Sequence, residues 1–259
     1  MQLSGTGKKD HLVLRKSSVR YVLTVVGLIV CCSLSFWWGG SNQAPEAGTV
    51  LLTENLRNFP HAVCQKLWKV DFADSPQWSF NSGNREKQQE FQVLFRKFGL
   101  ETTAFTNLDI REIEASHDQV VIHKASSIEQ DWVLVEDSAL DVAGENIGIN
   151  IRWNLHRLPE WIGRRAVYTA KLAHKVGEVV YVYTGVVSGR IVEPRGDVRP
   201  GAEFDPYFLP DQSDKTLAEG ADDTFSPRAI AMKKLVRGQV DACSRLITVW
   251  DGAWQNEQK

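Results

Sequence analysis

The stretch 78-WSFNSGNREK-87 decides the fold, because three kinds of local structure follow one another within it. Residues 78–80 form a short β-prone run, and residues 81–84 are small and polar and include a glycine. The apolar residues of 91–98 then fall at i, i+3, i+4 and i+7, which predicts an amphipathic helix ending near Gly99. A strand, a turn and a helix in this order indicate an α/β domain.

The rest of the domain continues the alternation of strands and helices. Residues 132–136, WVLVE, predict a buried strand that ends at Glu136-Asp137, and residues 179–187 and 190–192 predict a hairpin around Ser188-Gly189. Further helices are expected in the following segments: a short one through Val63, Leu67 and Val70, then 117–127, 161–175 and 227–235.

Composition excludes some classes of function. The 259 residues carry a formal net charge of -2, so we expect no general nucleic-acid surface. None of the four cysteines forms a CxxC pair, which argues against a zinc site. Cys64 and Cys243 can pair only if the fold brings them together, and the sequence leaves this open.

The N-terminal region predicts a membrane anchor. Residues 21–38 carry no charge and are long enough to span a bilayer as a helix, with aromatic residues at the end. Residues 1–20 form a basic tail, so the positive-inside rule predicts a single-pass protein with a cytoplasmic N-terminus. A cleaved signal peptide and a buried helix are the alternatives, and the side on which the large domain lies stays open. The remaining predicted segments are a linker with a short helix at 39–77, the main domain at 78–245 and a C-terminal tail at 246–259.

The turn after the first strand is a candidate phosphate site. Ser82, Gly83 and Asn84 would present backbone N–H groups at a helix N-terminus, and Lys87 lies about one turn into the helix. The alternative is an N-capped helix with a solvated lysine. The sequence lacks GxxxxGK[ST], so the turn is not a P-loop.

Asp137 is the candidate metal ligand. It follows an apolar strand, where α/β sheets place ligands, and Mg²⁺ prefers one or two carboxylates plus ligand phosphates. A capping aspartate that begins a turn is an equal alternative. Lys124 stands in a mostly apolar helix, where it either snorkels to solvent or points into a cleft.

Several segments together resemble the inosine triphosphate pyrophosphatase family. The resemblance runs from about Trp78 to about Leu235. Its motifs stand in order and with sensible spacing: Ser82-Gly83-Asn84-Arg85-Glu86-Lys87; Lys124-Ala125; Val135 to Leu140; Ile151-Arg152-Trp153; Ser188 to Gly196; and Phe204-Asp205-Pro206-Tyr207-Phe208-Leu209-Pro210, followed by Asp214-Lys215-Thr216.

The resemblance implies a fold and a reaction. The fold would be a long central mixed sheet with flanking helices and two lobes around a nucleotide cleft, usually as a homodimer. The reaction would be Mg²⁺-dependent hydrolysis of inosine or xanthosine triphosphate to the monophosphate and pyrophosphate. Asp137 would hold the metal and act in catalysis with Lys87. The residues implied to bind the nucleotide are Ser82, Gly83, Asn84, Lys87, Lys124, Arg152, Phe204, Asp205, Lys215, Ser226 and Arg228.

The sequence departs from the family pattern at the base pocket and the metal site. An expected aromatic is Ala202 and an expected glycine is Glu203. An expected histidine is Pro227, and an expected lysine is Asp222. The second metal carboxylate aligns with Ser116, with Glu114 or Asp118 as possible replacements. Three functions follow: a pyrophosphatase with changed base preference, a nucleotide- or partner-binding module without catalysis, or a membrane-tethered structural protein.

Overall fold

The computed structural model of this chain describes residues 59–71, 77–100, 102–198 and 202–255. The predicted basic tail at 1–20 and anchor at 21–38 lie outside the described residues, as does most of the predicted linker. Among the residues that are described, no helix combines the length and the apolar character that crossing a bilayer requires.

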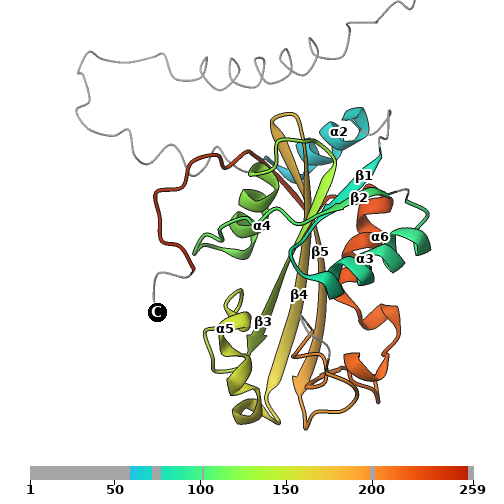
Figure 1. The fold of residues 1–259 in the computed structure, drawn as a ribbon, viewed down its shortest axis with the longest axis vertical. Helices are drawn as coiled ribbons and strands as arrows, with labels where there is room; N and C mark the ends of the chain where they lie inside the picture. The colour runs from blue at the N-terminus through green and yellow to red at the C-terminus, as the bar shows by residue number, and fades with distance from the viewer. Residues whose placement is uncertain (1–58, 72–76, 101, 199–201, 256–259) are drawn as a thin grey trace, which may run out of the picture. The chain divides into compact units, whose positions relative to one another are not determined.

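A seven-stranded mixed sheet forms the centre of the domain (Figure 1). The strand order is β2-β1-β3-β4-β5-β6, and β7 pairs with the first residues of β5, at the opposite end of that strand from β6. β1 is parallel to β2 and β3, and all other pairs are antiparallel. The strands are β1 (Trp78–Asn81), β2 (Thr102–Thr106), β3 (Val133–Val142), β4 (Arg165–Val176), β5 (Val179–Ile191), β6 (Phe208–Pro210) and β7 (Ala242–Arg245).

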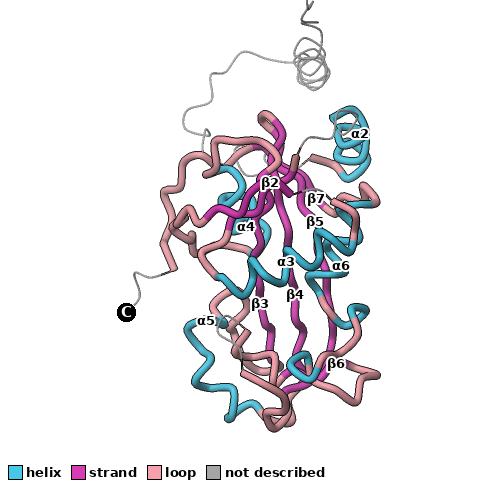
Figure 2. Tube along the Cα trace, turned by 45° about the vertical axis from the view of Figure 1, so that its right-hand side comes forward, coloured by secondary structure: helices cyan, strands magenta, loops and turns pink. Residues whose placement is uncertain are grey.

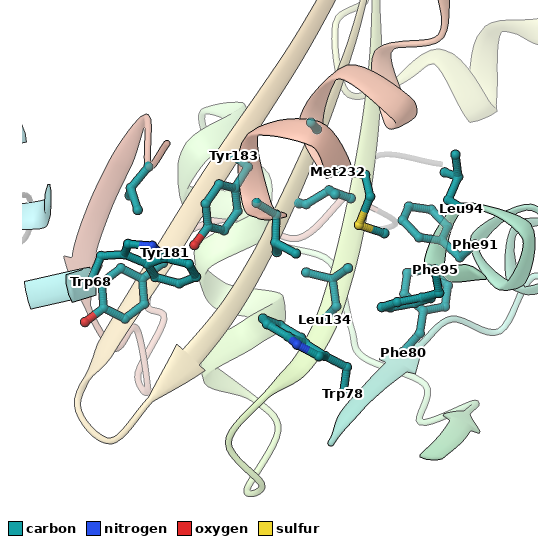
Figure 3. Close-up of a cluster of buried hydrophobic side chains, with 14 of the residues drawn as sticks. Trp68, Trp78, Phe80, Phe91, Leu94, Phe95, Leu134, Tyr181, Tyr183 and Met232 are labelled. Atoms are coloured by element: carbon teal, nitrogen blue, oxygen red, sulfur yellow. The ribbon is translucent and has the colours of Figure 1, made fainter. Parts of the chain in front are cut away.

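Helices cover both faces of this sheet, so the predicted α/β class with a mixed central sheet is confirmed (Figures 1 and 2). The faces are separated by the two-residue period of the strands. Leu134 enters the core under α3 and α6 (Figure 3), whereas Val133 and Val135 enter the core under α4. The α-helices are α2 (His61–Asp71), α3 (Arg85–Lys97), α4 (His117–Ser126), α5 (Ile151–Asn154) and α6 (Pro227–Val236), and short 3-10 turns are η2 (Leu155–Trp161), η3 (Leu217–Glu219) and η4 (Asp223–Phe225).

The opening strand, turn and helix are confirmed as predicted. Asn84 caps α3, because its Oδ1 accepts hydrogen bonds from the backbone N–H groups of Glu86 and Lys87 at 2.9 and 3.1 Å. Gly99 follows the end of α3 with φ of 70°, a conformation that glycine adopts without strain. The predicted helices that correspond to α2, α4 and α6 are also confirmed.

The predicted helix at 161–175 is wrong, because most of this segment is β4. Residues 166–172 alternate between buried and half-buried positions, the period of a strand. β4 pairs with β3 on one side and with β5 along its whole length on the other. Ladder pairing on both sides overrides the helical propensity of the alanines, lysines and leucine in this segment.

The predicted hairpin around Ser188-Gly189 is also wrong. β5 is one continuous strand, and the turn that joins it to β4 lies at Gly177, with φ of 56°. Gly189 serves close packing instead, because a Cβ there would lie 2.4 Å from the carbonyl oxygen of Leu209. The close approach of β6 at this point therefore requires a residue without a side chain at position 189.

The strand predicted to end at Glu136-Asp137 continues to Val142. The strand is longer than predicted because its two neighbours cover different parts of it. β1 ends at Asn81, which lies opposite Val135, while β4 pairs with β3 from Val135 through Val142. Glu136 and Asp137 therefore lie in the middle of β3, just past the carboxyl end of its parallel neighbour.

A disulfide bond joins Cys64 of α2 to Cys243 of β7, which answers the question that the sequence left open. The Cα atoms are 5.6 Å apart, and the bond connects residues 179 positions apart in the chain. Two side chains of α2, His61 and Gln65, also reach the backbone oxygen of Val240, each at 2.9 Å. The helix that precedes the sheet is therefore tied to the last strand.

The segment after β7 packs back onto the domain. Ile247 is buried against α4, and its N–H donates to Ser126 Oγ at 2.9 Å. Gln255 Nε2 donates to the carbonyl oxygen of Ile113 at 3.1 Å. Residues that the sequence assigns to a tail thus hold the loop that leads into α4.

His174 of β4 is completely buried beneath α2. Its ring stacks on Tyr183, with ring centroids 5.8 Å apart, and Trp132 lies against it at 5.4 Å. Trp68 of α2 contacts it edge-on. Burial lowers the pKa of His174 to about 3, so the ring is neutral at physiological pH.

Candidate active site

A cavity of about 850 Å³ opens where β1 ends, against the middle of β3. Its walls are residues 81–87, residues 107–110 with Glu112, the middle of β3, α5, and residues 203–204. We call it the main cavity. A smaller cavity of about 390 Å³, the side cavity, lies between α3 and residues 202–228. Glu86, Lys87 and Arg228 line both, so the two spaces adjoin.

The β1–α3 turn forms one wall of the main cavity. Ser82 Oγ accepts from the backbone N–H of Asn84 at 3.2 Å, and Asn84 caps the helix, so both side chains shape the turn. The N-terminus of α3 carries the positive end of the helix dipole at this wall. The residues implied to bind phosphate are therefore gathered at one place, with Gly83 exposed between them.

Glu136 is a buried carboxylate that holds two cations. Its side chain is 1% exposed, and Oε2 lies 2.6 Å from Lys87 Nζ. Oε1 accepts from Arg228 Nε at 3.1 Å. Burial alone would raise the pKa of Glu136, but the charges of Lys87 and Arg228 hold it well below its usual range. Arg228 also pairs with Glu90, at 2.7 Å, so this network links β3 to α3 and α6.

Asp137, the next residue, points to the opposite face of β3 and forms a second network. Its Oδ1 lies 2.5 Å from Lys124 Nζ, and its Oδ2 lies 3.1 Å from His117 Nε2. Burial would raise the pKa of Asp137, but the charge of Lys124 and the hydrogen bond from His117 lower it. Lys124 Nζ also lies 2.7 Å from Glu112 Oε1.

Lys124 is therefore an internal cation rather than a snorkelling surface residue. Burial would lower the pKa of its ammonium group, but the two carboxylates of Asp137 and Glu112 raise it above its usual range. The side chain is 13% exposed and lines the main cavity.

The other predicted site residues divide between the two cavities. Arg152 of α5 and Phe204 line the main cavity, whereas Asp205 and Ser226 line the side cavity. Lys215 lines neither of these two cavities and is exposed. It is thus the one predicted nucleotide-binding residue that the fold does not place beside the others.

The residues that depart from the family pattern have clear structural roles. Ser116 caps α4 in a capping box with Gln119, and Asp222 caps η4. Ala202 and Pro227 are buried walls of the side cavity, and Glu203 lines the main cavity.

Neither suggested replacement for a carboxylate at position 116 reaches Asp137. Glu114 accepts from Asn150 Nδ2 at 3.1 Å, and Asp118 forms an ion pair with Lys171. Neither of them lines the main cavity.

Sequence reasoning missed three residues of the site: Glu136, Glu112 and His117. Glu136 stands beside Asp137 in the sequence, and a buried strand with two successive carboxylates indicates charge on both faces. Nothing local marks Glu112 or His117, because His117 meets Asp137, and Glu112 meets Lys124, only in the folded chain.

The donor set fits a divalent cation bound together with a phosphate ligand. Asp137 and Glu112 offer carboxylate oxygens to the same position, where Lys124 supplies a positive charge. Within the described ranges, no group of three or more His, Cys, Asp or Glu residues is arranged to hold a metal ion. Mg²⁺ does not require one, because it commonly takes one or two carboxylates and completes its shell with water and phosphate oxygens.

These features define a class: an α/β protein whose mixed sheet opens beside a helix N-terminus into a cleft lined with paired cations and carboxylates. Within that class, the chain belongs to the Ham1 family, whose model matches residues 78–238. The resemblance to inosine triphosphate pyrophosphatases is thereby confirmed.

Three relatives show the extent of the similarity. The chain is 31% identical over 166 residues to the inosine triphosphate pyrophosphatase of Scheffersomyces stipitis, covering 54% of this chain and 84% of that protein. It is 33% identical over 179 residues to the dITP/XTP pyrophosphatase of Hyperthermus butylicus, covering 60% and 90%. It is 27% identical over 176 residues to the inosine triphosphate pyrophosphatase of Schizosaccharomyces pombe, covering 60% and 91%.

Proposed function

We propose that this protein is a nucleoside triphosphate pyrophosphatase with a changed base preference. It would convert a nucleoside triphosphate and water to the monophosphate and pyrophosphate. The observation that carries the proposal is the main cavity, which joins a helix N-terminus, five basic side chains and Asp137 in one space. Its relatives, named for cleavage of inosine and xanthosine triphosphates, support the same reaction class.

The triphosphate would lie in the main cavity. The N-terminus of α3 and the basic side chains of Lys87, Lys124 and Arg152 would neutralise its charge. Lys87 and Lys124 each lie against a buried carboxylate before ligand binds, which limits the mobility of both ammonium groups. Mg²⁺ bound at Asp137 would withdraw electron density from the phosphoryl oxygens. No covalent intermediate on the protein is needed.

The base would enter the side cavity. Tyr168 and Phe204, packed edge-on with centroids 4.9 Å apart, stand at its boundary. Ala202 and Pro227 leave this wall without the stacking ring and the hydrogen-bonding imidazole that the family pattern places there. Such losses cost a few kcal/mol of discrimination, so we expect selectivity for a 6-oxopurine to fall by about 10²-fold.

The test is pyrophosphate release by the full chain with Mg²⁺ and a panel of purine and pyrimidine triphosphates. We expect release from several of them, and we expect Asp137→Asn to reduce kcat at least about 10²-fold. Asp141→Asn is the matched control, because Asp141 lies on the same face of β3 but is exposed. No release from any triphosphate would overturn the proposal.

A second candidate is a nucleotide-binding module that does not catalyse. One observation favours it: the position where the family pattern has a metal carboxylate is a helix-capping serine here, Ser116. Such a module would bind triphosphates by calorimetry without releasing pyrophosphate. Its binding would weaken in Lys87→Ala but survive Asp137→Asn.

Placement in the cell is a separate proposal. We propose that residues 21–38 anchor the chain as a single-pass protein and that the folded domain faces an oxidising compartment. The Cys64–Cys243 bond supports this side, because stable disulfides are rare in the cytosol. Thiol alkylation of the full chain from its native source, before and after reduction, would test it. If both cysteines are already free to react, the domain faces a reducing compartment.

The domain boundaries at 20, 38, 77 and 245 and a homodimeric state stay predictions. Sedimentation of the full chain at several concentrations would test the homodimer, and a single species with the mass of one chain would exclude it.

A further inference from the structure

The segment that follows β7, residues 246–255, contacts α4 and then reaches one wall of the main cavity (red in Figure 1). At the end of α4, the N–H of Ile247 donates to Ser126 Oγ at 2.9 Å. Further along, the segment lies beside the loop of residues 107–114, most of whose residues line the main cavity. We call these two parts the C-terminal segment and the wall loop.

Backbone hydrogen bonds join the C-terminal segment to the wall loop. The backbones of residues 112–114 and 253–255 form two hydrogen bonds, at 2.9 and 3.1 Å, around an antiparallel bridge between Ile113 and Trp254. The buried Gln255 adds a third, since its Nε2 donates to the carbonyl oxygen of Ile113 at 3.1 Å. Among the residues that the structure describes, the backbone of 112–114 forms no hydrogen bond to any other part of the chain.

The side chains of the wall loop alternate between the cavity and the C-terminal segment. Glu112 lines the main cavity, where its Oε1 lies 2.7 Å from Lys124 Nζ. Its two neighbours do not line that cavity: the guanidinium of Arg111 lies over the ring of Trp254 at 4.1 Å, and Ile113 is fully buried. This is the period of an extended chain. One face of the loop is therefore cavity wall, and the other rests on the C-terminal segment.

Trp254 also connects the wall loop to α4. Its ring contacts Arg111 and meets the ring of His123 edge-on, with the ring centroids 5.8 Å apart. Neither Trp254 nor Gln255 lines the main cavity or the side cavity, so both can affect a ligand only through the wall loop. Both residues also lie beyond residues 78–238, the part of the chain that the family model matches.

We propose that the C-terminal segment positions the wall loop for triphosphate binding, with Trp254 and Gln255 as the positioning residues. This inference rests on the proposed function. Without these contacts the wall loop would be ordered for only part of the time, and a ligand would have to order it. The apparent affinity falls by the fraction of molecules in which the loop is ordered, whereas the bound complex is unchanged. Loss of positioning therefore raises KM more than it lowers kcat.

The first experiment measures kcat and KM for pyrophosphate release by the full chain with Mg²⁺ and its best triphosphate. Trp254→Ala should raise KM about tenfold and leave kcat within about threefold of the unmodified protein. Gln255→Met, which removes the side-chain bond to Ile113, should raise KM about threefold. A variant that merely folds poorly contains less active protein, so its apparent kcat falls while its KM stays the same.

Two control variants accompany these measurements. Trp254→Phe keeps an aromatic ring against Arg111 and His123, so its KM should stay within about twofold of that of the unmodified protein. Val249→Ala changes a residue of the C-terminal segment that is 78% exposed, and its KM should stay within the same limit.

Hydrogen exchange measured by mass spectrometry gives a readout that needs no turnover. Peptides from the wall loop should exchange faster in Trp254→Ala than in the unmodified protein, while peptides from β3 should exchange equally in both. The α,β-methylene analogues of ATP and ITP test the link to the ligand. Binding of either analogue should restore protection of the wall loop, since a ligand stabilises the conformation that it binds.

Two results would overturn the inference: an unchanged KM in Trp254→Ala, or equal exchange of the wall loop in this variant and the unmodified protein. If the unmodified protein releases pyrophosphate in that case, the proposed function stands and the positioning role fails. If the unmodified protein releases none, the proposed function fails and hydrogen exchange decides the inference. Faster exchange of the wall loop that an analogue reverses would then support a positioned binding loop, and equal exchange would reject it.

Discussion

Two regions of this protein bury ionisable side chains in opposite ways. In the middle of β3, Glu136 and Asp137 are kept charged, because cations from α3, α4 and α6 reach them. On the neighbouring strand β4, His174 is kept neutral, because aromatic rings surround it and α2 covers it. Ala173, which precedes His174, is the partner of Val135, which precedes Glu136. Burial alone therefore does not determine whether a side chain is charged. The groups that pack against that side chain on its face of the sheet determine it.

The difference follows the division between cleft and core. Charged pairs stand where β1 ends and the sheet opens to the main cavity, so a ligand can exchange with their partners. The neutral histidine is completely buried in the core, among the aromatic rings that pack against it. Changes at the two places should therefore affect stability with different dependence on pH.

The largest loss of stability is expected from Glu136→Gln. It removes the charge that Lys87 and Arg228 share, and Arg228 is itself only 5% exposed. Breaking a buried pair on one side typically costs about 3–5 kcal/mol in the free energy of unfolding. Urea unfolding at pH 7 measures this value. A loss below about 1 kcal/mol would mean that solvent compensates both cations when the carboxylate charge is removed.

A smaller loss of stability is expected when the pH is lowered, because of the buried neutral residue His174. His174 has a pKa of about 3 in the folded protein against an ordinary value of 6.5, so the unfolded chain binds the extra proton between these values. Its stabilising contribution is complete above pH 6.5 and is lost as the pH falls toward 3. Between pH 7 and pH 5 we expect a loss of about 2 kcal/mol, measured by urea unfolding.

Two variants test whether His174 causes this pH dependence. His174→Phe should remove most of it, while His156→Gln, at an exposed histidine, should retain it. A part will remain in His174→Phe, because burial and the charge of Lys124 also lower the pKa of His123. Glu136 and Asp137 do not contribute in this pH range, since the pKa of each carboxyl is lowered and both stay ionised at pH 5. Equal pH dependence in His174→Phe and the unmodified protein would contradict the assignment.

The smallest effect is expected from Glu90→Gln. Glu90 contacts the same Arg228 as Glu136 does, at 2.7 Å, but its side chain is 39% exposed. Water compensates for the lost charge at such a position, so we expect a loss of no more than about 1 kcal/mol in the same urea experiment. Similar losses in Glu90→Gln and Glu136→Gln would show that burial does not separate the two partners of Arg228.

Local patterns predicted the parts of the fold in which a residue's neighbours in sequence decide its structure. The spacing of 91–98, the cap at Asn84 and the glycine at 99 are enough to define α3, and the structure agrees. The segment 165–176 lacked such a determinant. Its alanines and lysines permit a helix, and only pairing with β3 and β5, which comes from distant sequence, selects a strand.

The candidate site likewise has one part that the sequence predicts and one part that it does not. The turn at 82–87 could be found from sequence because it is one contiguous segment. The partners of Glu136 are separated from it by 49 and 92 residues, and no local period encodes such contacts. Gly189 shows the opposite error: the residue type suggests a turn, but its cause is the close approach of Leu209.

The disulfide also determines how mechanical load would enter the domain. A force on the chain before α2 would meet Cys64 in the first turn of that helix and pass covalently to Cys243. From there it would reach the β7–β5 ladder, in which Tyr181 lies opposite Cys243. With the bond intact, the load would fall on hydrogen bonds of the central sheet; with the bond reduced, α2 would peel away first and expose the aromatic rings around His174.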